Sequence, residues 1–169
     1  MKYAELGKTG LKCAVVSFGG IPIQRSDAAN TMAVVDALEK HGMNFIDTAR
    51  GYTVSEEYLG AALKGRREKF LLATKSMSRN YENMKKDIET SLHNLQTDYI
   101  DLYQLHNLPV KDFEQVFGPD GAYKALEEAR AAGKIGHIGA TAHSLDALRM
   151  MIEDYSDKIE TVMFPYNIV

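Results

Sequence analysis

Short apolar runs of β-type residues alternate with longer amphipathic segments along almost the whole chain. The short runs predict six strands, at residues 13–18, 44–47, 70–75, 99–105, 137–141 and 161–165. Between them, helical spacing of apolar residues predicts five helices, at residues 28–41, 55–64, 82–95, 123–132 and 144–152. Strands that alternate with helices in this way are typical of a parallel sheet covered by helices.

Local signals mark several ends of these elements. Gly133 follows the fourth helix and is expected to form a left-handed C-cap, and Ser144 is the expected N-cap of the fifth. Residues 3–6 and 11–12, joined through a Gly-Lys-Thr-Gly turn, predict a small hairpin before the first strand. Residues 113–120 form the longest segment for which no element is predicted.

Composition limits the class of protein. With 169 residues and 45% apolar content, the chain suits one globular domain. Its net charge of −3 gives no reason to expect nucleic acid or an anionic membrane as a partner. A single cysteine, Cys13, excludes an internal disulfide and a multi-cysteine metal site, and its apolar surroundings favour a plain buried thiol. No signal-peptide pattern or membrane span is evident, so we predict a cytoplasmic protein without a metal.

Four polar residues stand at or just past the ends of three predicted strands: Asp47, Tyr52, Lys75 and His106. Each has an ordinary structural explanation when taken alone. Asp47 could cap a turn, Tyr52 could be a packed aromatic residue, Lys75 could extend to water, and His106 could be hydrogen-bonded at a strand end. Because the carboxyl ends of strands in βα units face one side of the fold, we expect the four to meet there.

The four side chains together would form a general acid with an electrostatic clamp. A phenol has a pKa of about 10, and an adjacent cation favours the phenolate form. Lys75 could supply that cation to Tyr52, and Asp47 could pair with Lys75. His106 could donate an N–H to a substrate oxygen, so the group would stabilise a developing alkoxide.

The order and spacing of these residues resemble the aldo-keto reductase family. The matching segments are FIDTARGY at 45–52 with Ser55 and Glu56, ATK at 73–75, DYIDLYQLH at 98–106, GKIGHIG at 133–139, FPYN at 164–167 and LGKTGL at 6–11. The loop around Tyr52 is closest to the branch in which a ferredoxin-like domain follows the barrel.

The resemblance implies a (β/α)8 TIM barrel that binds NADPH, or less often NADH, and reduces a small aldehyde or ketone. Under it, Tyr52 becomes the proton donor, Lys75 and Asp47 its tuning pair, and His106 the residue that orients the carbonyl.

The resemblance also implies residues that contact the cofactor. They are Gly20 and Ile21 after the first strand, Asp47, and Thr141 in the place of a family serine near the nicotinamide carboxamide.

Three positions depart from the family pattern. Thr53 replaces the glycine that usually follows the tyrosine. Ala142, followed by His143, replaces an asparagine beside the carboxamide, and Met163 replaces a glutamine.

Length adds a further expectation, because an eight-unit barrel needs about 250 residues. We expect residues 1–169 to be a single truncated barrel domain with about six parallel strands, five helices and the hairpin. In the family, the missing later loops hold the adenosine phosphate. Open sheet edges should favour self-association with another chain.

Three interpretations remain open from the sequence. The chain could be an aldo-keto reductase or an inactive fragment of one. It could be a non-catalytic binding or assembly module derived from the barrel. It could also be an open doubly wound sheet, although no glycine-rich phosphate motif follows the first strand.

Overall fold

The computed structural model of the protein describes residues 1–167. Its strands are β1 (Tyr3–Glu5), β2 (Lys12–Ala14), β3 (Phe18–Gly19), β4 (Phe45–Asp47), β5 (Leu71–Ser76), β6 (Ile100–Leu105), β7 (Ile135–Thr141) and β8 (Thr161–Met163). Its α-helices are α1 (Ala28–His41), α2 (Ser55–Leu63), α3 (Tyr81–Asn94), α4 (Phe113–Phe117), α5 (Ala122–Ala131) and α6 (Leu145–Glu153). Short 3-10 helices cover Ile21–Arg25, Arg67–Lys69 and Val110–Asp112.

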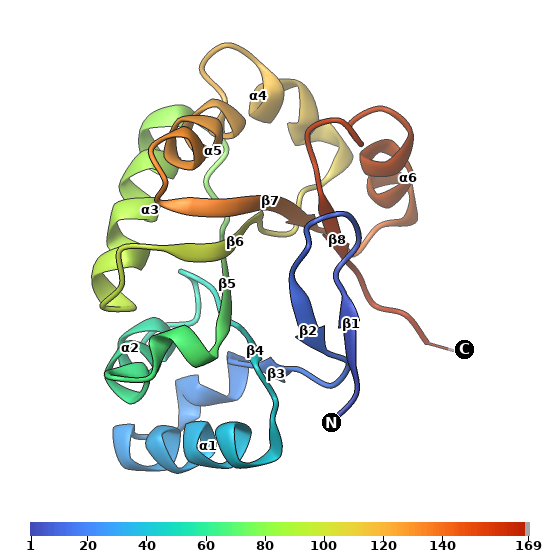
Figure 1. Ribbon diagram of the computed structural model, residues 1–169. Coiled ribbons are helices and arrows are strands. Elements are labelled where there is room, and N and C mark those ends of the chain that lie inside the picture. The colour runs from blue at the N-terminus through green and yellow to red at the C-terminus, as the bar shows by residue number, and fades with distance from the viewer. Residues whose placement is uncertain (168–169) are drawn as a thin grey trace.

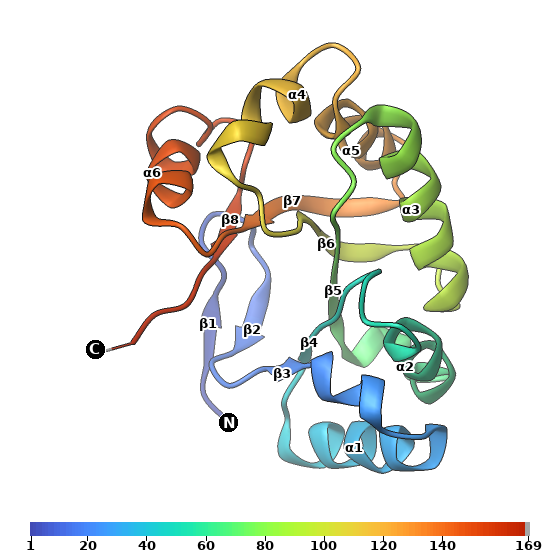
Figure 2. The ribbon, with the colours of Figure 1, turned by 180° about the vertical axis from the view of Figure 1, so that it is seen from behind.

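Strands β3 to β8 form one parallel sheet in the order of the sequence, β3-β4-β5-β6-β7-β8. The sheet curls, and helices α1, α2, α3 and α5 lie around the outside of the curl (Figures 1 and 2). A doubly wound sheet reverses its strand order at a switch point, and this sheet does not. The predicted partial (β/α)8 barrel with an N-terminal hairpin is therefore confirmed, and the doubly wound alternative is excluded.

Two apolar layers lie on opposite faces of the sheet. The outer layer packs residues such as Ile46 and Leu72 against Leu38 of α1 and Leu59 of α2. The inner layer packs Cys13 of the hairpin against strand residues Phe45, Ala73 and Leu102. Because side chains alternate along a strand, residues in phase with this inner layer point into the barrel.

The hairpin of β1 and β2 therefore lies against the beginnings of the barrel strands. Cys13 is buried there, as expected from its sequence context, and burial raises the pKa of its thiol. A thiol of this kind is less reactive than an exposed one.

The predicted first strand, 13–18, is wrong as a single element. Its beginning belongs to β2, and only Phe18 and Gly19 join the barrel sheet. Val15 and Val16, between them, are 58% and 56% exposed. The apolar run is interrupted because the chain must leave the hairpin and turn into the barrel wall.

Residues 113–120 were expected to lack an element, but they contain α4. Phe113 and Val116 are buried, and the ring of Phe113 packs 5.2 Å from that of Tyr155. The apolar residues at 113, 116 and 117 have helical spacing. The helix is only five residues long, however, which is too short for this spacing to be recognised as a periodic pattern. The described residues therefore contain α4 in addition to the five predicted helices.

The end signals were predicted correctly. Gly133 has a left-handed φ of +73°, and the Ser144 hydroxyl accepts from the backbone N–H of Ala147. β8 ends at Met163, two residues before the predicted end.

Within residues 1–167, no helix has the length and apolar character needed to cross a membrane.

Candidate active site

The four predicted residues converge at the carboxyl ends of the strands. Asp47 ends β4, Lys75 lies near the end of β5, His106 follows β6, and Tyr52 lies in the loop between β4 and α2. A pocket of about 270 Å³ opens above them. It is lined by Tyr52, Lys75, His106, Thr141, Ala142, His143, Met163, Phe164 and Pro165.

Lys75 and Asp47 form a buried ion pair at the base of this pocket. The Lys75 ammonium donates to Asp47 Oδ2 and, at 2.7 Å, to the carbonyl oxygen of Thr48. The Gln104 amide donates to Asp47 Oδ1 at 2.9 Å. Burial raises the pKa of Asp47, while the charge of Lys75 and the hydrogen bonds from Lys75 and Gln104 oppose the rise. Each member of the pair therefore has hydrogen-bond partners that offset its desolvation.

The Tyr52 ring contacts both Lys75 and His106. The Lys75 ammonium is 5.0 Å from the ring centroid, and the His106 ring meets Tyr52 edge-on at 5.8 Å and 86°. From the sequence, we expect Lys75 to favour the phenolate. In the structure, partial burial and the negative charge of Asp47 raise the pKa of Tyr52 instead. The ordinary pKa of a phenol is about 10, so with this upward shift Tyr52 is a protonated phenol at neutral pH.

The His106 imidazole is neutral at physiological pH. Burial lowers its pKa to about 4, and the charges of Lys75, Arg79 and His143 act in the same direction. Its Nδ1 is buried and has no hydrogen-bond partner among the residues that the structure describes. A neutral imidazole carries one N–H, so this ring can still donate one hydrogen bond.

Arg79, after β5, holds the backbone beside the His106 ring. Its guanidinium donates to the carbonyl oxygens of His106 and Asn107, both at 2.9 Å, and to Asp112 at 2.9 Å. Asn107 has a left-handed φ of +48°, and its backbone N–H donates to Thr141 Oγ1 at 2.7 Å. These contacts join the ends of β6 and β7 around the pocket.

Gln104 and Arg79 were both missed from the sequence. Gln104 stands two residues before His106 in a strand, so the alternation of side chains could have placed it on the same face. Arg79 lies in an irregular loop, where no periodic signal was available.

The predicted cofactor residues fall into two groups. Thr141 lines the pocket together with Tyr52, Lys75 and His106. Gly20 and Ile21 lie beside the backbone of Asp47, because the Gly20 N–H donates to the Asp47 carbonyl at 2.7 Å. A Cβ at Gly20 would lie 2.9 Å from Ser55 Oγ, so packing within the protein already requires glycine there. Around Gly19, by contrast, a Cβ would meet nothing within 4 Å.

Thr53, which replaces the usual glycine, adopts a left-handed φ of +43°. This conformation is rare for β-branched residues. The backbone thus keeps the geometry typical of glycine although the residue has changed. Ala142 and Met163, the other two departures, both line the pocket.

The aldo/keto reductase family model matches residues 15–169. The chain belongs to the aldo/keto reductase family. Family membership agrees with the resemblance found in the sequence and with the curled parallel sheet.

Similar proteins include two curated family relatives and one solved structure. The chain is 29% identical to aldo-keto reductase YhdN of Bacillus subtilis, covering 99% of this chain and 54% of the relative. It is 31% identical to L-galactose dehydrogenase of Arabidopsis thaliana, covering 88% and 50%. The holo form of aldo-keto reductase AKR11C1 from Bacillus halodurans matches with a TM-score of 0.85 and 29% identity, covering 98% and 58%. This aldo/keto reductase chain thus spans about half the length of the curated relatives.

Within the part of the chain that the structure describes, no group of three or more His, Cys, Asp or Glu side chains is placed to hold a metal ion.

Proposed function

We propose that this chain carries the catalytic residues of an oxidoreductase that uses NADPH, or NADH, to reduce a small aldehyde or ketone. The observation that carries the proposal is the convergence of Tyr52, Lys75 and His106 at one pocket, with Asp47 paired to Lys75. Membership of the aldo/keto reductase family supports the same reaction class.

Tyr52 is the proposed proton donor to the carbonyl oxygen. Its raised pKa keeps the proton on the phenol until charge develops on the substrate. The Lys75 ammonium, 5.0 Å from the ring centroid, then stabilises the negative charge that forms on the phenolate. Asp47 and the Thr48 carbonyl oxygen accept from that ammonium and keep it in place, and Gln104 in turn holds Asp47.

His106 is the proposed orienting donor. Because its pKa is lowered to about 4, the ring is neutral and offers a single N–H at neutral pH. A neutral donor can hold the carbonyl oxygen without competing with Tyr52 as the source of the proton.

The residues around the pocket fit the nicotinamide end of a dinucleotide, which supplies a hydride when it is bound. Thr141 Oγ1 accepts from the Asn107 N–H, so its own hydrogen is free to donate to a carboxamide oxygen. The open space at Gly19 admits a group close to the backbone.

The test compares the wild-type chain with Tyr52→Phe, using NADPH or NADH and a reactive aromatic aldehyde. Loss of the phenol should lower turnover by about 100-fold or more, because general acid catalysis contributes about that much. NADPH affinity, measured by nicotinamide fluorescence, should stay unchanged because the hydroxyl acts on the substrate. Turnover by Tyr52→Phe at the wild-type rate would remove Tyr52 from this role.

A non-catalytic binding or assembly module is the second candidate. It is favoured by Ala142 and Met163, two departures from the family pattern that both line the pocket. NADPH binding without consumption of any aldehyde would support this module. The truncated single-domain organisation of residues 1–169, the ferredoxin-like branch and a cytoplasmic location stay predictions.

A further inference from the structure

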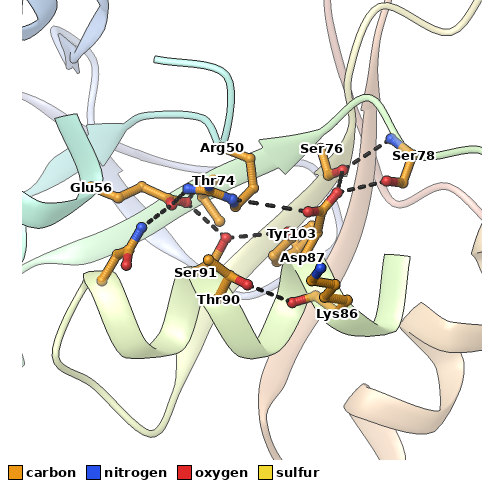
Figure 3. Close-up of polar contacts among 11 residues, drawn as sticks. Arg50, Glu56, Thr74, Ser76, Ser78, Lys86, Asp87, Thr90, Ser91 and Tyr103 are labelled. Carbon is orange, nitrogen blue, oxygen red and sulfur yellow. Dashed lines mark hydrogen bonds and ion pairs between the residues drawn. The ribbon is translucent and has the colours of Figure 1, made fainter. Parts of the chain in front are cut away.

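A network of side-chain hydrogen bonds on the outer face of the sheet holds β5, the strand that carries Lys75. Side chains alternate along β5, so Thr74 and Ser76 point away from the face that Lys75 occupies. The Thr74 hydroxyl donates to Glu56 Oε1 at 2.7 Å, and the Ser76 hydroxyl donates to Asp87 Oδ2 at 2.5 Å. The two neighbours of Lys75 are thus each held by a carboxylate from a covering helix (Figure 3).

Arg50 connects these two carboxylates. Its Nη1 donates to Glu56 Oε2 at 2.5 Å, and its Nε lies 3.9 Å from Asp87 Oδ1. Figure 3 shows the Arg50 guanidinium between the Glu56 and Asp87 side chains. The backbone N–H of Arg50 also donates to the carbonyl oxygen of Lys75 at 2.9 Å.

The burial of Glu56 makes this connection energetically important. The Glu56 side chain is 0% exposed, and its carboxylate also accepts from Ser91 Oγ at 2.7 Å. A buried carboxylate that loses its cationic partner must be rehydrated or protonated, and either outcome moves the groups around it. Its pairing raises the pKa of the Arg50 guanidinium in spite of burial, so Arg50 stays charged.

Arg50 also lies between two members of the catalytic set in the sequence, three residues after Asp47 and two before Tyr52. Arg50 therefore joins the Tyr52 loop to β5 in two ways. Its backbone N–H bonds to Lys75 directly, and its side chain acts through the Glu56 and Asp87 carboxylates. Displacements of about 1 Å at a catalytic group can cost about 100-fold in rate, so such a connection matters for chemistry.

We propose that Arg50 is a positioning residue for Lys75. By joining Glu56 and Asp87, it fixes Thr74 and Ser76 on both sides of Lys75 and holds the Lys75 ammonium at Asp47 and Tyr52. The inference rests on the proposed function only for its effect on turnover, because the position of Lys75 can be measured without substrate or cofactor.

The test measures hydrogen exchange of the Lys75 ammonium by NMR in a chain labelled at lysine nitrogen, with the signal assigned through Lys75→Met. In Arg50→Gln, exchange at Lys75 should be faster by about tenfold or more, because local opening governs exchange of buried groups. Backbone amide exchange in β7 is the internal reference and should not change. Lys75 exchange within about twofold of wild type, with that reference unchanged, overturns the proposal.

Ser91→Ala is the matched control. It removes a hydrogen bond from the same Glu56 carboxylate but leaves Arg50, Thr74 and Ser76 connected. Lys75 exchange should remain at the wild-type rate in this variant. If Lys75 exchange increased as much in Ser91→Ala as in Arg50→Gln, loss of any hydrogen bond to Glu56 would be enough to expose Lys75 to exchange. That result would overturn the specific role of Arg50.

A second variant decides the question if Arg50→Gln does not fold. The double variant Thr74→Val with Ser76→Ala removes the two side-chain hydrogen bonds between β5 and the carboxylates but leaves Arg50 paired with both carboxylates. It should accelerate Lys75 exchange by about tenfold, and wild-type exchange would overturn the proposal.

Turnover gives the second readout. If the chain reduces aldehydes, Arg50→Gln should lower kcat by about 10-fold to 100-fold while KM and NADPH affinity stay within about twofold. An increase in KM with an unchanged kcat would contradict a positioning role at Lys75. Absence of turnover in the wild-type chain would contradict the proposed function, and the exchange result would then decide the role of Arg50 by itself.

Discussion

Burial and neighbouring charges set the protonation states in the pocket. Burial and Asp47 raise the pKa of Tyr52 above the ordinary phenol value of about 10, so Tyr52 is protonated at neutral pH. His106 is neutral because burial and nearby cations lower its pKa. The two residues therefore have different roles at neutral pH. One holds a proton that it can give up, and the other offers a fixed hydrogen bond.

The lowered pKa of His106 predicts a pH-dependent loss of stability. The folded-state pKa of about 4 lies below the unfolded value of about 6.5, so the unfolded chain takes up the proton first as the pH falls. The free energy of unfolding should therefore be at its full value above about pH 6.5 and should decrease between about pH 6.5 and pH 4.

Urea unfolding at about pH 7 and pH 4.5 measures this effect in wild type and His106→Gln. The wild-type chain should lose more stability on acidification than the variant. His93→Gln, which removes an exposed histidine, is the control and should keep the wild-type loss. An equal loss in wild type and His106→Gln would contradict the shifted pKa.

Single residues were predictable from the sequence where they end a strand. Asp47, Lys75 and His106 stand at such ends, and the structure places them together with Tyr52. The direction of the Tyr52 pKa was not predictable, because it depends on burial and on the distance to Asp47. Arg79 and the Arg50 connection were also hidden, because they join segments distant in the sequence.

At the level of elements, side chains alternate between the two faces of a strand. The proposed catalytic side chains therefore lie on one face of the sheet, and the side chains that hold the strand lie on the other. One face of β5 carries Lys75 into the pocket, and the other carries Thr74 and Ser76 to the covering helices. The same alternation explains why Gln104 reaches Asp47 from β6. The split between β2 and β3 was not predictable, because a continuous apolar run gave no sign of the turn at Val15 and Val16.

The close approach of α2 and α3 gives a prediction at this scale. A Cβ at Gly60 of α2 would lie 2.7 Å from the carbonyl carbon of Leu95, just after α3, and 2.9 Å from its Cα. Gly60→Ala should lower the free energy of unfolding by about 1–3 kcal/mol, because overpacking against backbone forces the helices apart.

Chemical denaturation checks this value, with Gly51→Ala as the control. A Cβ at Gly51 meets nothing within 4 Å, so that variant should stay within about 0.5 kcal/mol of wild type. Equal stabilities of the Gly60 and Gly51 variants would show that the helices can separate at no cost.

At the level of the whole molecule, the proposed catalytic residues lie on a sheet with two edges. β3 and β8 each pair with one neighbour in this sheet. On and beside β8, Val162, Met163 and Phe164 are 36%, 39% and 37% exposed. Unpaired edges with exposed apolar side chains favour association with another chain.

We therefore predict that the purified chain self-associates. Its mass by light scattering should increase with protein concentration, and Val162→Lys should reduce the increase, because a lysine on an edge strand opposes pairing. Val110→Lys places the same charge at a 42% exposed apolar residue outside the sheet and should leave association unchanged. A constant monomeric mass at all concentrations would contradict the prediction.

The most direct test of the account is transfer of deuterium to an aldehyde from NADPH that carries deuterium at both hydrogen positions of the nicotinamide C4. Mass spectrometry of the alcohol product should show deuterium on the former carbonyl carbon for the wild-type chain. Tyr52→Phe should give about 100-fold less labelled alcohol under the same conditions. Unlabelled alcohol, no alcohol at all, or equal labelled product from both chains would contradict the proposal that these residues catalyse carbonyl reduction.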